Sequence, residues 1–406
     1  MAGPSETRKM IAALIPIYGI TLIDCFGYMI MVPLLPYLAQ KFGASGVLVG
    51  ALLATMAVAS TVAAPFWGAI SDRAGRKPIV LISQVISLIG YLALAWAPTL
   101  AMLFVSRGIA GIGGGNLGVT QSYIADVTPQ RYRDRAYAVF GAMFGLGIVL
   151  GPVTGGFLVR FGFWVPFVVA AVIEVLNIGL TIRFLPATKR GKDGRLNLRA
   201  AAKVVVSEPA IRSLIVRHFL FIFAVTYFFS VFALYVKRAL DFGPQEASWL
   251  MAGTGVVGGV MLVIVVGPVA KRLGDAVVAQ IGLALNAIAY GLLGFAHELW
   301  FFVCVLVVWG AGAACIEPTI AALLSKGSPA DKRGATLGFN DAMSNLALMA
   351  APALGGWVID KDPRLIGVIP GAAIAFAFVL GWLRRSEDAK TDKGLPQARS
   401  EPATAS

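Results

Sequence analysis

Four charged residues stand near the middle of long apolar stretches of this chain: Asp24, Arg107, Glu174 and Glu317. A charge at the centre of a lipid bilayer costs at least ~2.5 kcal/mol, so such residues usually face a cavity and take part in moving ions or protons. A nearby arginine changes how tightly a carboxylate holds its proton. The four residues are therefore candidates for proton binding and for contact with a substrate.

Each candidate also has a structural alternative. Arg107 could form a fixed ion pair, and Asp24, at a similar depth in the first stretch, is its natural partner. Glu317 precedes Pro318, and a proline breaks the regular helix and opens backbone groups to a cavity, which favours a functional role. Glu174 could equally be a protonated acid that is hydrogen-bonded to a neighbouring helix.

The elements that position these residues are apolar segments near the ~20 residues that a bilayer demands. The chain holds twelve such segments, six before and six after a polar stretch. The sequence therefore predicts an all-α membrane protein with twelve transmembrane helices. We place the segments at 11–38, 46–70, 78–97, 99–121, 136–159, 163–185, 213–236, 245–270, 276–296, 299–324, 335–358 and 365–383.

The two groups of six segments are copies of one pattern. Proline, glycine and arginine residues recur 200 positions later, and Gly68-Ala-Ile-Ser-Asp72-Arg-Ala-Gly75 has a weaker echo in Gly267-Pro-Val-Ala-Lys-Arg-Leu-Gly274. A parallel duplication of six-helix halves is typical of secondary transporters. The fold expected is two pseudo-symmetric six-helix bundles. The recurring pairs are Pro129 and Pro329, Arg133 and Arg333, Pro152 and Pro352, Gly155 and Gly355, and Gly156 and Gly356.

Composition agrees with a membrane protein. Of the 406 residues 58% are hydrophobic and 14% charged, too few charges to cover the surface of a soluble protein. The net charge of +13 comes from basic residues scattered over short loops, which argues against nucleic-acid binding and fits contact with anionic lipid. Most Lys and Arg residues fall in loops on one side, which predicts that both termini are cytoplasmic.

Residues with other chemistry are sparse. Cys25, Cys304 and Cys315 stand in apolar runs without metal-ligand spacing, so we interpret them as packing residues and expect no metal site and no cofactor. No phosphate-binding loop, HExxH or GxSxG motif occurs, so an enzyme is not expected.

The loop between the second and third segments carries the most specific motif. Gly68, Asp72, Arg73, Gly75, Arg76 and Lys77 place a tight turn, one carboxylate and three cations within ten residues. The carboxylate needs a cation or a helix N-terminus as its partner. The motif resembles the signature of the major facilitator superfamily between its second and third helices, and the resemblance extends over the whole chain.

The fifth segment narrows the resemblance. It reads Gly147-Ile-Val-Leu-Gly151-Pro152-Val-Thr-Gly155-Gly156, in which small residues allow close helix crossing and the proline permits a bend. This run is similar to the motif of the drug/proton antiporter branch; close packing alone is the structural alternative. Further similarity to the tetracycline-efflux group lies in Asp24, in Pro33-Leu-Leu-Pro36, in Arg107-Gly-Ile-Ala-Gly111 and in Tyr123-Ile-Ala-Asp126.

One departure bears on the substrate. Tetracycline pumps have acidic residues in their third and ninth spans, whereas 87–91 and 283–287 here contain none. The resemblance therefore implies the branch and not the ligand.

The resemblance also implies roles for particular residues. Arg107 corresponds to an arginine that couples proton movement to transport. On the cytoplasmic side Asp72 is expected to meet the start of the eleventh span, near Asn340 and Asp341, when the cavity faces outward, and Arg76 is expected to meet Asp126. Solvated loop charges are the alternative reading, and each exposed pair of that kind contributes only ~0–1 kcal/mol.

The sequence as a whole predicts an N-terminal bundle (1–185), a cytoplasmic connector (186–212), a C-terminal bundle (213–385) and a disordered tail (386–406). The function predicted is proton-coupled antiport that exports small amphipathic or cationic compounds by alternating access. A proton-coupled or facilitated importer on the same scaffold is the main alternative, and a non-transport membrane protein is a weaker one. We expect a functional monomer in a bacterial inner membrane, with protons, a small-molecule substrate and lipid as partners.

Overall fold

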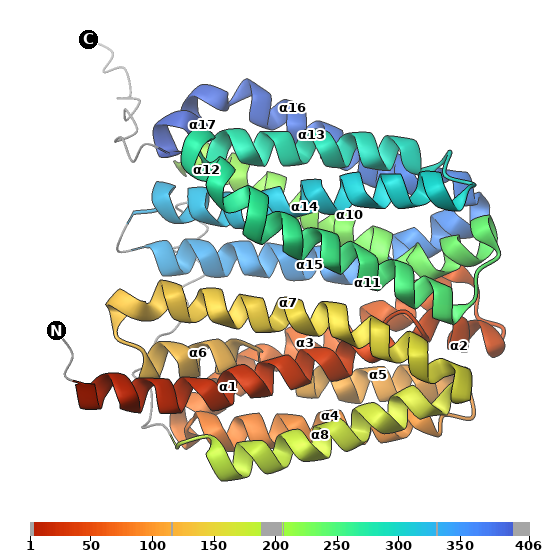
Figure 1. The fold of residues 1–406 in the computed structure, drawn as a ribbon, viewed down its shortest axis with the longest axis horizontal. Helices are drawn as coiled ribbons and strands as arrows, with labels where there is room; N and C mark the ends of the chain where they lie inside the picture. Colours follow the sequence, from red (N-terminus) through yellow and green to blue (C-terminus); the bar gives the residue numbers. More distant parts are fainter. Residues whose placement is uncertain (1–3, 115–116, 188–204, 206, 330–331, 393–406) are drawn as a thin grey trace. The chain divides into compact units, whose positions relative to one another are not determined.

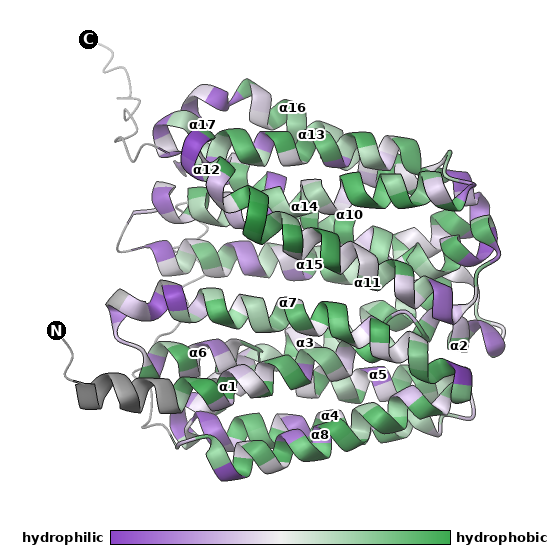
Figure 2. Cartoon of the chain, in the orientation of Figure 1, coloured by the Kyte–Doolittle hydropathy of each residue, from purple (hydrophilic) through white to green (hydrophobic). Residues whose placement is uncertain are grey.

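The computed structural model describes residues 4–114, 117–187, 205, 207–329 and 332–392. In this part of the chain twelve helical stretches are long and apolar enough to cross a bilayer, which confirms the predicted fold class. Hydrophobic residues follow the middle of the helices, and hydrophilic residues gather mainly near their ends (Figure 2). Most of the expected connector, including Lys189, Arg195 and Lys203, lies outside the described residues, as does the tail beyond Asp392.

The first half contains six spans, some of them built from two helices in succession (Figure 1). The first span breaks after Met31, because Pro33 has no N–H to continue the helix. Short 3₁₀ turns, Gln130–Tyr132 and Val159–Phe161, flank the fifth span. The helices are α1 (Pro4–Met31), α2 (Leu35–Lys41), α3 (Gly46–Ala74), α4 (Arg76–Ala95), α5 (Leu100–Gly114), α6 (Leu117–Val127), α7 (Arg133–Leu158) and α8 (Trp164–Phe184).

The second half repeats this order of spans (Figure 1). Its second span contains one π-helical segment, Met261–Val266, between α11 and α12. A 3₁₀ turn, Pro363–Gly367, precedes α16. The helices are α10 (Pro209–Leu240), α11 (Pro244–Val260), α12 (Gly267–Leu273), α13 (Asp275–Leu293), α14 (Leu299–Gly327), α15 (Arg333–Lys361), α16 (Val368–Leu383) and α17 (Arg385–Asp392).

The duplication seen in the sequence is also present in the backbone. Gly75 (φ 92°) separates α3 from α4, and its N–H donates to the oxygen of Ser71. Gly274 (φ 87°) separates α12 from α13 in the same way and donates to Ala270. A side chain is strained at such positive φ, so glycine is needed at both turns. The sequence similarity between 68–75 and 267–274 therefore reflects the same turn occurring once in each half.

One compact unit of the chain comprises residues 1–194, 226–256 and 348–366. Within it α1 packs on α7 and α8, α4 packs on α5 and α8, and α3 packs on α5. The unit is larger than the expected N-terminal bundle, because the ends of α10 and α15 and most of α11 belong to it. Glycines create these contacts: the main chains of Gly46 and Gly356 touch, as do those of Gly50 and Pro352.

The other compact unit comprises residues 195–225, 257–347 and 367–406. In it α13 packs on α14 and α16. The expectation of a disordered tail is wrong for 386–392, which form most of α17. The physical reason is a buried ion pair, in which Arg217 Nη1 lies 2.8 Å from Asp388 Oδ2. Lys326 adds further contacts, 2.8 Å to Asp275 and 2.7 Å to Asp392.

Candidate functional site

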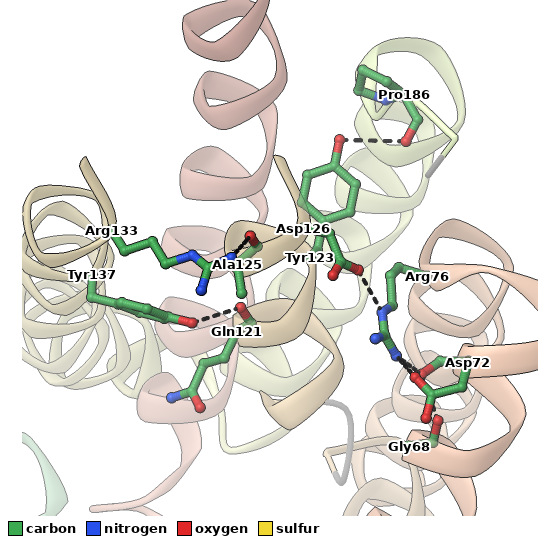
Figure 3. Close-up of polar contacts among 11 residues, drawn as sticks. Gly68, Asp72, Arg76, Gln121, Tyr123, Ala125, Asp126, Arg133, Tyr137 and Pro186 are labelled. Carbon is green, nitrogen blue, oxygen red and sulfur yellow. Dashed lines mark hydrogen bonds and ion pairs between the residues drawn. The ribbon is translucent and has the colours of Figure 1, made fainter. Parts of the chain in front are cut away.

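The motif loop between α3 and α4 is organised around the Arg76 guanidinium (Figure 3). Nη1 lies 2.6 Å from Asp72 Oδ1 and 2.5 Å from Ser71 Oγ, and Nε lies 3.1 Å from Asp126 Oδ2. The side chain of Arg76 is buried, and a buried charge is stable only when it is compensated; here the carboxylates of Asp72 and Asp126 compensate it. The expected contact between Arg76 and Asp126 is confirmed. The meeting of Asp72 with Asp341 stays a prediction.

The end of α6 next to this network is held by further hydrogen bonds (Figure 3). Arg133 Nη2 donates to the oxygen of Ala125 (3.0 Å), and the Tyr137 hydroxyl donates to that of Gln121 (3.1 Å). Of the other motif cations, Lys77 donates to the oxygen of Ile182 (2.8 Å) and Arg73 is exposed. The loop thus connects α3, α4, α6 and α8 within one unit.

The glycines of the fifth span lie where α7 meets α1, as the motif predicts. A Cβ at Gly147 would lie 2.7 Å from Cys25 Cβ, one at Gly151 would overlap Met29, and one at Gly155 would overlap the oxygen of Ile30. Gly156 instead faces Ser248 of α11. Close approach of α7 therefore fixes the position of α1 along the segment that carries Asp24.

Asp24 and Glu174 belong to one polar cluster inside this unit, which we call the N-half acid cluster (Asp24, Glu174 and Asn177). Asn177 Nδ2 donates to Asp24 Oδ1 over 2.5 Å, and the Asn177 side chain also hydrogen-bonds Glu174. Asn177 and Glu174 are buried and Asp24 is half-buried. Oε1 of Glu174 and Oδ1 of Asn177 have no hydrogen-bond partner. The cluster lies between α1, α4 and α8.

Arg107 on α5 does not form the ion pair expected with Asp24. Its side chain is 1% exposed, its Nη2 lies 3.8 Å from Met31 Sδ, and its Nε and Nη1 have no hydrogen-bond partner. Tyr91 of α4 interacts electrostatically with Arg107 and with both acids. The Tyr91 ring also lies beside Gly27 of α1, where a Cβ would be in ordinary contact with it, 3.8 Å from Cε2. Arg107 and the two acids are thus not directly paired, and all three interact with the same tyrosine.

Glu317 belongs to a second polar group, in the other unit, which we call the C-half acid cluster (Glu317 and Asp341). The two acids interact electrostatically, and both side chains are exposed. Next to Asp341 on α15, Asn340 hydrogen-bonds His218 of α10, and Ser344 Oγ lies 3.3 Å from His218 Nδ1. His218 is buried in this group.

Sequence reasoning missed Asn177. An uncharged amide in an apolar stretch gives no charge signal, and only its position three residues after Glu174, on the same face of a helix, could have singled it out. Among the described residues no group of three or more His, Cys, Asp or Glu side chains is arranged to hold a metal ion.

Twelve apolar spans in duplicated halves, with buried acids and an arginine inside them, define a secondary transporter of the membrane. The sequence matches the Major Facilitator Superfamily over residues 17–243 and 214–405, and the chain belongs to that family.

Similar proteins include the class C tetracycline resistance protein of Escherichia coli, 31% identical over 84% of this chain and 88% of that protein. Multidrug resistance protein 1 of Bacillus subtilis (strain 168) is 26% identical over 89% of this chain and 93% of its own length. Among solved structures, the human organic anion transporter MFSD10 has a TM-score of 0.69 at 19% identity, covering 92% of this chain and 99% of that one. That likeness concerns the fold.

Proposed function

We propose that this chain is a proton-driven exporter of small amphipathic or cationic compounds. The observation that carries the proposal is the N-half acid cluster, in which carboxylates are packed between helices of an apolar bundle without a directly paired cation. Such an acid is costly to leave charged, so it exchanges protons as the helices move. The similarity to resistance proteins for tetracycline and for several drugs supports export as the direction.

The cargo proposed follows from the surroundings of the acids. The exposed C-half acid cluster offers carboxylates to a cationic group, and apolar side chains dominate the spans around it. In the ninth span, where tetracycline pumps have an acid, Asn286 instead donates to the oxygen of Trp309 over 3.3 Å. Because that acid is missing, a cationic compound other than tetracycline is the cargo proposed.

The experiment is transport into proteoliposomes with an imposed pH gradient, using ethidium, norfloxacin and tetracycline as probes. Antiport predicts that an acidic interior drives accumulation of a probe, because protons leaving the vesicle pull the cargo inward. An importer that couples by symport requires the opposite gradient. Accumulation driven only by an alkaline interior would therefore replace this proposal by the importer.

The proposed setting is a bacterial inner membrane with both termini in the cytoplasm and a monomer as the functional form. The network around Arg76 supports that orientation, because its loop lies on the side of the spans that is richer in basic residues. Reporter fusions at the loops after α4 and after α8 test it, and light scattering in detergent tests the monomer.

A further inference from the structure

The geometry of α8 singles out one face of the sixth span. Glu174 and Asn177 are three residues apart, so both point to the same side of the helix. That side meets α1 and α4, the two helices against which α8 packs. Asn177 is fully buried and donates to Asp24, which is half-buried and thus the more accessible of the two acids.

The hydrogen bonding of this face is incomplete. Glu174 Oε1 and Asn177 Oδ1 are buried acceptors without a donor, although buried polar atoms in a purely structural network are almost always satisfied. A carboxylic O–H on either acid is a donor within the same cluster. The geometry therefore suits a carboxyl group that gains and loses a proton in place.

Charge balance limits how many protons the cluster holds. Two carboxylates and one guanidinium interact with Tyr91 of α4, namely those of Asp24, Glu174 and Arg107, whereas α7 approaches α1 near Asp24 with Gly147 and the main-chain oxygen of Phe144. The group is neutral with one bound proton, and buried charges are stable only when compensated. The other titratable neighbours are Tyr28 and Cys25 of α1.

We propose that Asp24 and Glu174 share one coupling proton and that Asn177 is the positioning residue that joins them. The proton reaches the cluster at Asp24, the more accessible acid, and is shared with the buried Glu174. The Asn177 amide donates to whichever carboxylate is charged. When the proton leaves, the cluster carries one net negative charge, and the exchange of that proton for a singly charged cation keeps the transport cycle electroneutral. The inference rests on the proposed export function only for this last step.

The first experiment needs no substrate. Infrared difference spectroscopy of the purified chain during a pH titration detects the C=O band of protonated carboxyl groups. We expect a titrating band that is lost in Asp24→Asn and altered in Glu174→Gln. In Asn177→Leu its midpoint should move by about one pH unit to more alkaline pH, because the charged form loses a donor.

The matched control is Asn286→Leu. Asn286 is a buried residue of α13 whose side-chain amide donates to the main-chain oxygens of Trp309 and Gly282. A purely structural role for Asn177 predicts that both leucine variants lower the melting temperature and leave the midpoint in place, which would overturn the inference. If Asn177→Leu fails to fold, Asn177→Ala removes the same donor without adding volume.

Transport with ethidium separates this inference from the export function. If the parent chain shows no gradient-driven uptake while the band behaves as expected, the export proposal fails and the shared proton site stands. If the parent is coupled and both Glu174→Gln and Asn177→Leu keep its pH profile, the export function stands and the shared site is wrong.

Discussion

The N-half and C-half acid clusters differ in how their carboxylates are packed. Glu174 is enclosed between helices with an amide beside it, whereas Glu317 and Asp341 are exposed. A packed carboxylate can exchange only an ion as small as a proton, but an exposed one can also meet an organic cation. The difference favours proton binding in the first half and cargo contact in the second.

The duplication makes this asymmetry sharper. The turn glycines and the Gly/Pro positions occur in both copies, but 200 residues after Asp24, Arg107 and Glu174 the chain has Ala224, Val307 and Ile374. Ala224 and Ile374 are buried apolar residues. The features that bend and cross helices are therefore kept in both halves, whereas the charges of Asp24, Arg107 and Glu174 have no counterpart at the matching positions of the second half.

The largest effect is expected from removing a carboxylate of the N-half acid cluster. Asp24→Asn should abolish gradient-driven accumulation of ethidium while downhill exchange continues, because the amide keeps the hydrogen bonding and cannot bind a proton. Glu317→Gln should instead raise the concentration needed for half-maximal transport and leave coupling intact. Both are measured in proteoliposomes with and without a pH gradient.

The contrast between the two acid clusters is wrong if Glu317→Gln loses gradient-driven accumulation while Asp24→Asn only raises the concentration needed for half-maximal transport. Full gradient-driven transport in both would mean that the acids are structural. Arg107→Ala adds a check, since loss of the guanidinium leaves the acids uncompensated and should move the pH profile of exchange to more alkaline values.

The next effect tests whether burial alone makes an acid functional. Asp388 is buried like Glu174 but is paired with Arg217, so it should stabilise the fold without taking part in coupling. Asp388→Asn leaves a buried cation unpaired and should lower the free energy of unfolding by ~3–5 kcal/mol. Thermal unfolding in detergent measures this change.

The matched control for Asp388 is Glu387→Gln, one residue earlier on α17. Glu387 pairs with Arg384 at 2.7 Å, but its side chain is 44% exposed, so the cost should be only ~0–1 kcal/mol. A proton-to-cargo ratio that changes in Asp388→Asn would show that paired acids also take part in coupling.

A smaller effect is expected from moving the helix that carries Asp24. Gly151→Leu forces a side chain into Met29 and Ile30 of α1, and such overpacking costs ~1–3 kcal/mol. It should also make transport leaky, because α1 is displaced next to the acid cluster. Proton leak and ethidium transport are measured together.

Gly145→Leu on the same helix is the control, since a Cβ there meets nothing within 4 Å. Equal stability and tight coupling in both variants would contradict the close contact of α7 with α1.

Features that depend on local chemistry could be predicted from the sequence. The spans follow from apolar length, the turn at Gly75 follows from glycine spacing, and the approach of Gly147 and Gly151 to another helix follows from their small size. The Arg76 contact with Asp126 was expected from family resemblance and not from spacing.

Features that depend on the rotation of one helix about its axis could not be predicted. Hydropathy gives the depth of Asp24 and Arg107 but not the direction of their side chains, so their expected pairing was wrong. The neutral side chains of Asn177 and Gln84 interact with Asp24, and the tail helix α17 is held by Arg217, 171 residues before Asp388 in sequence. None of these contacts has a signal within its own segment.

The smallest effect on stability is expected outside both clusters, at Asp72 in the motif loop. Its side chain is 28% exposed and Arg76 keeps Asp126 as a partner, so Asp72→Asn should change the free energy of unfolding by no more than ~1 kcal/mol. Transport should nevertheless fall strongly, because the proposed contact with the eleventh span needs the charge. Asp241→Asn, which removes an exposed loop carboxylate at a positive φ that asparagine tolerates, is the control. Normal ethidium turnover in Asp72→Asn would contradict the proposed contact of Asp72 with the eleventh span.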